Sequence, residues 1–296
     1  MPCYRGPVDA PKVRSLDSAR SLRACWIGRI PYRTAWNLQK RLVAARTAGL
    51  IGDTLLVLEH EPVLTLGRGA DPAHVLASPA ELGVRGIEVI AVERGGEVTW
   101  HGPGQLVAYP ILRLADRGLL VRPLVRALEA ALIATCAEHG VAAARRDGHP
   151  GCWCDAEGPE PRKIGALGLR IERGVSYHGI ALNVAPDLRA FDLIDPCGMP
   201  GVASTSIAAE LGRPAEPPST AAVERAGQSF VRAFGSALGA DVTWTEPEAL
   251  FDGVDPAPDH DHEIASPGAQ ENASPGPQEI ASPGAQENAA LADARR

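Results

Sequence analysis

The densest group of glycine and polar residues lies at 94–105, which reads Arg-Gly-Gly-Glu-Val-Thr-Trp-His-Gly-Pro-Gly-Gln. Gly95 and Gly96 free the backbone for positive φ angles and let a ligand approach closely. Arg94 and His101 add a permanent cation and a titratable donor to the same loop. A hairpin with a glycine-rich turn and an exposed arginine has the same pattern, so spacing alone leaves both interpretations open.

A lysine and a cysteine further along the chain are candidates for nucleophilic chemistry. Lys163 opens the apolar segment Lys-Ile-Gly-Ala-Leu-Gly, and Cys197 lies between Pro196 and Gly198 in a predicted tight turn. A thiol in a turn is accessible, and a nearby ammonium group favours its nucleophilic thiolate form. Taken singly, a lysine at a strand start is more often solvated, and a free cysteine is more often a small buried apolar residue.

The six cysteines do not indicate a metal site. His149, Cys152 and Cys154 lie close together in the sequence. A structural zinc site needs four ligands, and no second cluster follows at suitable spacing, so we expect no metal. Residues 1–30 contain no long apolar run typical of secretion, so free thiols in a reducing, cytoplasmic compartment are expected.

The net charge of −7 is concentrated at one end of the chain. Residues 254–296 carry eight acidic residues and two arginines, a net charge of −6, which leaves residues 1–253 close to neutral. Basic residues would dominate a nucleic-acid-binding domain, so nucleic acid is not expected as a partner. No run of about 18 apolar residues occurs, so no membrane span is predicted.

Composition divides the chain into three segments. Residues 1–20 are predicted to be a flexible basic leader, and a transit peptide is less favoured because prolines interrupt an amphipathic helix. In residues 254–296, Ser-Pro-Gly recurs every eight residues from position 266. This Pro-, Gly- and Glu-rich tail cannot build a packed core and is predicted to be disordered. Residues 21–253 remain as a single folded domain.

Residues 21–253 predict a mixture of helices and strands. Apolar runs bounded by turn residues predict strands over 54–58, 63–66, 88–92, 97–100, 105–112, 164–171 and 176–184. Apolar residues at helical spacing predict helices over 119–139 and 219–238. Helices beside strands, without regular alternation of the two, indicate an α+β domain.

Prolines and glycines refine this prediction. Pro62 separates the first two strands as a hairpin or a strand–loop–strand unit. Pro110 lacks a backbone N–H, so the strand over 105–112 is expected at a sheet edge or with a bulge. Arg173 and Gly174 predict a hairpin turn between the last two strands.

Taken in order, the distinctive segments resemble the lipoyl(octanoyl) transferase family, within the wider group of biotin and lipoate protein ligases. The resemblance runs from about residue 32 to residue 238. It rests on the segments 32–36, 58–60, 94–105, 163–168, 178–183 and 196–198. It implies a single α+β catalytic domain of the biotin/lipoate protein ligase type over residues 21–253, with a mixed β-sheet flanked by helices.

The resemblance also implies an activity. A member of this family transfers an octanoyl group from octanoyl-acyl carrier protein to a lysine of lipoyl domains, through a thioester on a cysteine and without a cofactor. The acceptors are the lipoyl domains of 2-oxo-acid dehydrogenases and the glycine cleavage H protein, and the reaction is the first step of protein lipoylation. Cys197 falls at the position of the nucleophile and Lys163 at that of its partner. The residues that fall on the acyl-binding segments are Arg94, Gly95, Gly96, Glu97, Val98, Thr99, Trp100, His101, Ala166, Leu167, Gly168, Gly179, Ile180 and Ala181.

Two departures from the family pattern remove no catalytic group. Gly165 stands where a small or apolar side chain is more usual, and Cys152 and Cys154 surround Trp153 of the family's Gly-x-Trp strand. The acidic partners implied by the resemblance predict a basic patch near the acyl site. The candidates for this patch are Arg94, Arg145, Arg146, Arg162 and Arg170.

Three other functions are compatible with parts of the pattern. An ATP-dependent lipoate or biotin ligase makes an acyl-adenylate and needs no cysteine nucleophile, so the presence of Cys197 argues against it. A thioester hydrolase differs only in that water takes the acyl group. A non-catalytic acyl-binding module has no need of the Cys197 and Lys163 pair.

Overall fold

The computed structural model describes residues 20–195, 202–213 and 217–252. The predicted nucleophile Cys197, the predicted tail and nearly all of the predicted leader lie outside the described residues. The described residues belong to one compact unit.

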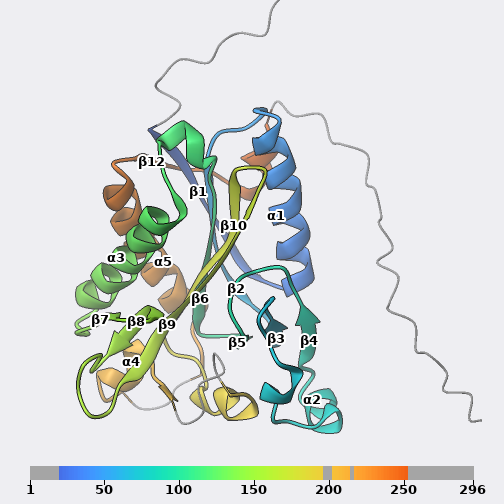
Figure 1. The fold of residues 1–296 in the computed structure, drawn as a ribbon, viewed down its shortest axis with the longest axis vertical. Coiled ribbons are helices and arrows are strands. Elements are labelled where there is room, and N and C mark those ends of the chain that lie inside the picture. Colours follow the sequence, from blue (N-terminus) through green and yellow to red (C-terminus); the bar gives the residue numbers. More distant parts are fainter. Residues whose placement is uncertain (1–19, 196–201, 214–216, 253–296) are drawn as a thin grey trace, which may run out of the picture. The chain divides into compact units, whose positions relative to one another are not determined.

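A mixed sheet forms the centre of this unit (Figure 1). In the described part of the chain it has nine strands, eight of them in the order β12-β1-β2-β6-β10-β9-β8-β7, and β11 pairs with β9. β12, β1 and β2 run parallel, and the following neighbours are antiparallel. The strands are β1 (Ser21–Ile30), β2 (Thr54–His60), β6 (Gln105–Ile111), β7 (Ala144–Arg146), β8 (His149–Cys154), β9 (Arg162–Glu172), β10 (Val175–Asn183), β11 (Ala203–Ser204) and β12 (Asp241–Trp244).

A smaller sheet carries the glycine-rich segment. Its strands are β4 (Glu88–Ala91), β3 (Val63–Leu66) and β5 (Val98–His101), in the order β4-β3-β5. β3 is parallel to β4 and antiparallel to β5. The connection from β4 to β5 therefore crosses the end of β3, and it brings Arg94 beside Thr65 of β3.

Helices cover both faces of the large sheet (Figure 1). α3 (Val121–Glu138) and α5 (Thr220–Leu238) pack on one face, and α1 (Tyr32–Thr47) packs on the other. Phe230 and Phe234 of α5 are fully buried, and each contributes about 1.5–3 kcal/mol by burial. The remaining short helices are α2 (Pro79–Val84), α4 (Ile207–Glu210) and the 3-10 turns Pro72–His74, Leu114–Arg117, Leu188–Leu193 and Pro247–Phe251. None of the helices in the described residues has the length and apolarity needed to cross a bilayer.

The α+β class, with a mixed sheet flanked by helices, is confirmed, and so are the predicted strands and helices, close to their expected bounds. Among the described elements, the sequence pattern missed the helix α1 and the strands β1, β7, β8, β11 and β12. The buried face of α1 includes Gln39 and Arg46, which a search for apolar spacing passes over. Both are polar residues with specific partners: Gln39 accepts a hydrogen bond from the His178 backbone, and Arg46 pairs with Asp53.

The structure decides two expectations about strand neighbours. β2 and β3 form a strand–loop–strand unit and not a hairpin, because they belong to different sheets. The strand with Pro110 is not at an edge, since β6 lies between β2 and β10. Its ladder with β10 breaks off after Ala108, and Ser176 replaces it there: the Ser176 hydroxyl donates to the Pro110 carbonyl at 2.6 Å and accepts the Leu112 N–H at 3.1 Å.

An irregularity in β9 affects the residue predicted to be catalytic. Cys152 of β8 pairs with Gly165, but the next residue, Trp153, pairs with Lys163. Ile164 is thus an extra residue on β9, a β-bulge. Bulges re-aim a neighbouring side chain and are frequent at active sites.

Gly179 of β10 should be essential for the packing of β10 on β6. A Cβ atom at this position would lie 2.0 Å from the Ala108 carbonyl oxygen and 2.8 Å from Pro110 Cδ. We expect Gly179→Ala to lower the free energy of unfolding by about 1–3 kcal/mol, measured by urea denaturation.

Gly83→Ala is the matched control, because Gly83 lies in α2 and a Cβ there meets nothing within 4 Å. It should be neutral, or stabilising by up to about 1 kcal/mol through helix propensity. Equal losses in the two variants would contradict the packing argument.

Candidate active site

A pocket lies between β9, β10 and the segment 94–101. Most of the predicted acyl-binding residues line it: Arg94, Glu97, Val98, Thr99, His101, Ala166, Leu167, Gly168, Gly179, Ile180 and Ala181. Tyr32, Tyr109 and His178 complete the lining and were not in the predicted set. The structure thus brings together residues as far apart in the sequence as Tyr32 and Ala181.

Small residues on paired strands create the space. Gly168 pairs with Gly179, and Ala166 pairs with Ala181, in the antiparallel register of β9 and β10. Neither pair carries a side chain larger than a methyl group, so room remains above the sheet at this point. A Cβ on Gly168 would also lie 2.7 Å from the Gly95 carbonyl oxygen, so glycine lets the segment 94–97 approach β9.

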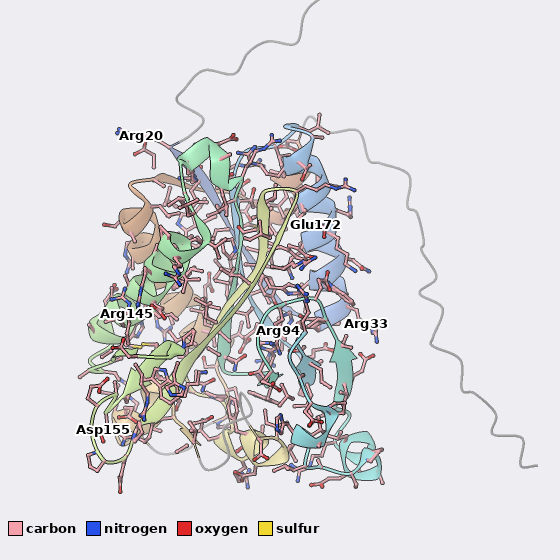
Figure 2. All side chains as sticks on the ribbon, in the orientation of Figure 1. Arg20, Arg33, Arg94, Arg145, Asp155 and Glu172 are labelled. Atoms are coloured by element: carbon pink, nitrogen blue, oxygen red, sulfur yellow. The ribbon has the colours of Figure 1, made fainter. Side chains whose placement is uncertain are left out.

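Arg94 is an internal anchor of this segment and is buried. Its guanidinium donates to the Thr65 carbonyl at 2.7 Å and to the Thr65 hydroxyl at 2.9 Å. The Gly95 N–H donates to the Leu169 carbonyl at 3.0 Å, which attaches the same loop to β9. Arg94 therefore places a fixed positive charge at the pocket wall. Figure 2 shows it between the small sheet and the large one.

Three predicted binding residues do not line the pocket. Gly95 and Gly96 belong to the loop behind Arg94, and Gly96 accepts a hydrogen bond from the Gly69 N–H. Trp100 is buried in the small core beneath β5, where its ring meets Phe191 edge-on at 5.5 Å. The three residues therefore lie behind the pocket wall and support it. Their roles in binding stay predictions.

Histidine and tyrosine rings form the polar wall of the pocket. His60 is fully buried; its Nδ1 lies 3.2 Å from the Ile30 carbonyl and its Nε2 lies 2.7 Å from the Tyr109 hydroxyl. A carbonyl can only accept, so Nδ1 carries the proton and Nε2 accepts from Tyr109. Tyr32 stacks on His101 at 5.9 Å and lies 3.5 Å from His178 Nδ1 through its hydroxyl.

A hydrogen-bond chain runs from His101 to the backbone of Lys163. His101 Nδ1 lies 2.7 Å from Gln105 Oε1, and Gln105 Nε2 donates to Asn183 Oδ1 at 3.0 Å. Asn183 Nδ2 donates to the Thr205 carbonyl at 2.9 Å, and the Thr205 N–H donates to the Lys163 carbonyl at 3.0 Å. The Gln105 oxygen is an acceptor in this chain, so His101 Nδ1 is protonated and its Nε2 is not.

Burial keeps the three histidines neutral. Loss of water lowers the pKa of His60 to about 4. Burial, with a smaller opposing effect of Glu93, lowers the pKa of His178 to about 4. The pKa of His101 is well below its usual value because of burial and the neighbouring His60 and Arg94. Burial also raises the pKa of Tyr109 well above its usual value. The wall can therefore donate and accept hydrogen bonds near pH 7 without adding charge.

Lys163 lies in a second cavity that adjoins the pocket. This cavity shares Thr99, Ala166 and Ala181 with the pocket, and it is also lined by Asn183 and Ser204. Lys163 is buried, and its Nζ lies 5.2 Å from the centre of the Trp153 ring. The structure thus brings Lys163 next to the predicted acyl-binding residues.

The residues that flank Cys197 in the sequence line a third hollow. Asp195 and Val202 lie at the two ends of the segment 196–201 and border this hollow. It shares Phe191 and Ser204 with the Lys163 cavity. Ser204 is the direct strand partner of Lys163.

Glu59 is a buried carboxylate that sequence reasoning did not single out as functional. It accepts the Gly104 N–H at 2.6 Å and the Thr220 hydroxyl at 2.8 Å, and it pairs with Arg29 at 3.1 Å. Gly104 has a φ of +85°, which favours glycine, and it ends the turn that follows His101. Glu59 thus fixes the turn on which His101 and Gln105 depend.

The missed lining residues carried a signal in the sequence. Tyr32 and His178 stand at the first positions of two segments on which the resemblance rests, 32–36 and 178–183. His178 also has a positive φ of 52°, which is uncommon for a residue with a side chain. No group of three or more metal-ligating side chains occurs in the described part of the chain.

Residues 31–234 match the family described as the lipoyl protein ligase A/B catalytic domain. The chain is 50% identical over 195 residues to an octanoyltransferase of Chloroflexus aurantiacus, covering 66% of this chain and 86% of that protein. It is 49% identical over 228 residues to an octanoyltransferase of Acidobacterium capsulatum, covering 74% and 91%. It is 44% identical over 227 residues to an octanoyltransferase of Mycobacterium leprae, covering 76% and 91%.

Solved structures share the fold at low sequence identity. A lipoate-protein ligase A bound with ATP aligns with a TM-score of 0.57 at 14% identity, over 78% of this chain and 93% of the other. A putative lipoate protein ligase from Thermoplasma acidophilum aligns with a TM-score of 0.56 at 14% identity, over 78% and 92%. These likenesses concern the fold.

Acid should destabilise the domain through its buried histidines. Between about pH 6.5 and pH 4 the unfolded chain binds protons at His60 and His178 that the folded chain does not, because their folded pKa is about 4. Stability should therefore be fully present above pH 6.5 and fall as the pH is lowered. Each histidine contributes up to about 1.4 kcal/mol per pH unit, measurable by denaturant unfolding at a series of pH values.

His60→Gln tests the assignment. The variant should be less stable at pH 7, because Tyr109 and Ile30 lose a partner, but its stability should fall less steeply between pH 6.5 and pH 5. A slope equal to that of the wild type would mean that His60 does not resist protonation in the folded state.

Proposed function

Because the chain belongs to the lipoyl protein ligase A/B catalytic domain family and is an acyltransferase of the lipoyl(octanoyl) transferase type, we propose that it moves an octanoyl group from octanoyl-acyl carrier protein to a lysine of a lipoyl domain through a thioester on Cys197. The observation that carries this proposal is that the pocket and the Lys163 cavity lie side by side. The pocket built on small residues meets the Lys163 cavity at Thr99, Ala166 and Ala181.

The pocket suits a medium-length acyl chain. Leu167, Ile180 and Val98 give it apolar surface, and the paired glycines at 168 and 179 give it room. Each buried methylene contributes about 0.8 kcal/mol, so a chain that fills the pocket binds more tightly than a shorter one. The ring wall of Tyr32, Tyr109 and His178 is polar, so extending a chain into it would leave buried polar groups unpaired.

In the first step, the Cys197 thiolate attacks the carbonyl carbon of the incoming thioester. A bond forms between Sγ and the acyl carbon, and the bond from that carbon to the carrier sulfur breaks. The ammonium group of Lys163 stabilises the thiolate beforehand and gives its proton to the departing carrier sulfur. One thioester replaces another, so the step needs no ATP.

In the second step, the acceptor lysine attacks as a neutral amine. A carbon–nitrogen bond forms, the bond to Sγ breaks, and Lys163, now neutral, takes the proton that the amine loses. The Cys197 thiolate and the Lys163 ammonium are thereby restored. Backbone N–H groups near Leu167 and Gly168 are our candidates for holding the oxyanion, and one such donor contributes about 2.7–4 kcal/mol in known enzymes.

The support for Cys197 is indirect but specific. The resemblance puts the nucleophile at this position, and the flanking residues Asp195 and Val202 border a hollow that shares Ser204 with the Lys163 cavity. Lys163 itself is supported by its burial and by the bulge at Ile164 beside it.

Intact-protein mass spectrometry after incubation with octanoyl-acyl carrier protein tests the mechanism. The wild type should gain one octanoyl mass, and a lipoyl domain should discharge it without ATP, whereas Cys197→Ser should gain none. Cys136→Ser is the matched control, because Cys136 is a buried core thiol and should leave loading unchanged. Transfer that occurs only with ATP would overturn the proposal in favour of an adenylate-forming ligase.

Two variants of Lys163 separate its proposed roles. Lys163→Arg keeps the positive charge that stabilises the thiolate but cannot exchange a proton. Acyl loading should only slow, because the carrier sulfur can also leave as a thiolate, whereas transfer to the lipoyl domain should fall by about 100-fold or more. Lys163→Met should lose both loading and transfer. Single-turnover measurement of each half-reaction checks this, and transfer at the wild-type rate by Lys163→Arg would exclude the proton-accepting role.

A further inference from the structure

We propose that an exposed basic groove at the start of α3 is the docking surface for the acidic carrier protein that delivers the acyl group. This inference rests on the proposed function. The groove, called the α3 groove below, runs between the first turns of α3 and the β7–β8 turn. Its walls include Val121, Arg122, Val125 and Arg126 from α3, and Arg146 and His149 from the turn.

The α3 groove is positively charged on a chain whose net charge is −7. Four arginines, at 122, 126, 145 and 146, face two carboxylates, Glu129 and Asp147. Arg145 and Arg146 belong to the predicted basic patch, whereas Arg94 is buried at the acyl pocket, well apart from Arg145 (Figure 2). A local excess of positive charge steers and holds an acidic protein surface.

Glu129 holds the arginines of the groove in place. Its carboxylate is almost fully buried and lies 3.0 Å from Arg126 Nη1 and 2.9 Å from Arg145 Nε. The Arg126 side chain is nevertheless 62% exposed. One buried carboxylate thus orients two guanidinium groups. Arg145 also donates to the Arg126 carbonyl at 2.9 Å, whereas the exposed Arg126 presents its outer N–H groups to the carboxylates of a partner. Pre-organised arginines lose little entropy on binding.

The N-terminal backbone N–H groups of α3 receive no side-chain cap from the described part of the chain. The first turn has no acidic residue, and Arg122 lies there. A cation at a helix N-terminus opposes the helix dipole, and the acidic residues of a partner would offset that cost. Leu120 and Val121 are 74% and 47% exposed beside these charges. An acidic helix with apolar residues on one side matches both features.

The α3 groove borders the Lys163 cavity through one aromatic ring. The Arg146 guanidinium lies 5.5 Å from the centre of the Trp153 ring, and Lys163 Nζ lies 5.2 Å from the same centre. Trp153 donates its indole N–H to the His149 carbonyl of the β7–β8 turn at 3.0 Å. A protein docked in the groove therefore lies at the β7–β8 edge of the sheet, next to the strand β9 that carries the proposed catalytic lysine.

The test compares Arg122→Ser/Arg126→Ser with Arg225→Ser/Arg232→Ser, which removes the same charge from α5. Arg232 pairs with Glu138 at the opposite end of α3, so the control pair lies away from the groove. With octanoyl-acyl carrier protein as donor, the groove variant should show a KM about tenfold higher, an unchanged kcat and a weaker dependence on salt. The control variant should match the wild type.

A small octanoyl thioester that lacks the carrier protein should acylate all three proteins equally. Equal KM values for the carrier-bound donor in the groove and control variants would overturn the inference. A groove variant that instead loses affinity for the lipoyl domain would assign the groove to the acceptor and also overturn it. Direct binding of the carrier protein separates this inference from the proposed function: a wild type that binds carrier through the groove but transfers no octanoyl group contradicts only the latter.

Discussion

The pairing of Gly168 with Gly179 is the constraint on which the site depends. Both residues line the pocket, and at each of them a neighbouring segment of the chain occupies the place of a side chain. The absence of side chains at these two positions lets the loop after Arg94 approach β9 and lets β10 approach the backbone of β6 at Ala108. One local property of the sequence thus lets the segments that enclose the pocket come together.

Around the pocket, buried polar side chains hold their neighbours in place through hydrogen bonds and stay uncharged. Neutral histidines at 60, 101 and 178 satisfy carbonyl, amide and hydroxyl partners, and the chain from His101 to Thr205 ends on the backbone of Lys163. One chain of hydrogen bonds therefore links the pocket wall to the backbone of the proposed catalytic lysine. Hydrogen-bonded buried networks make a site rigid. Among the described residues, His178 Nε2 at the pocket and Gln39 Nε2 of α1 are buried without a hydrogen-bond partner.

Two buried carboxylates serve comparable purposes beside α5 and α3, the two helices that cover one face of the sheet. Glu59 ties the turn at Gly104 to β1 and to the start of α5. Glu129 ties α3 to Arg145 of β7 and accepts the Gly151 N–H beside Lys163 at 3.3 Å. Each carboxylate stabilises the fold mainly by linking separate elements and less by its ion pair. Removing either one would leave buried groups without partners.

The amino-acid sequence by itself indicated the α+β class and most strands and helices, because glycine spacing and apolar periodicity are local properties. Most of the residues that line the pocket were named only through the family resemblance. It did not reveal that Pro110 lies in a central strand, since strand order depends on contacts between distant segments. It missed Tyr32, Tyr109 and His178, which reach the pocket only because α1 and β6 pack against β10. The tertiary structure alone brought Lys163 beside the pocket and placed Trp153 between that lysine and a basic groove.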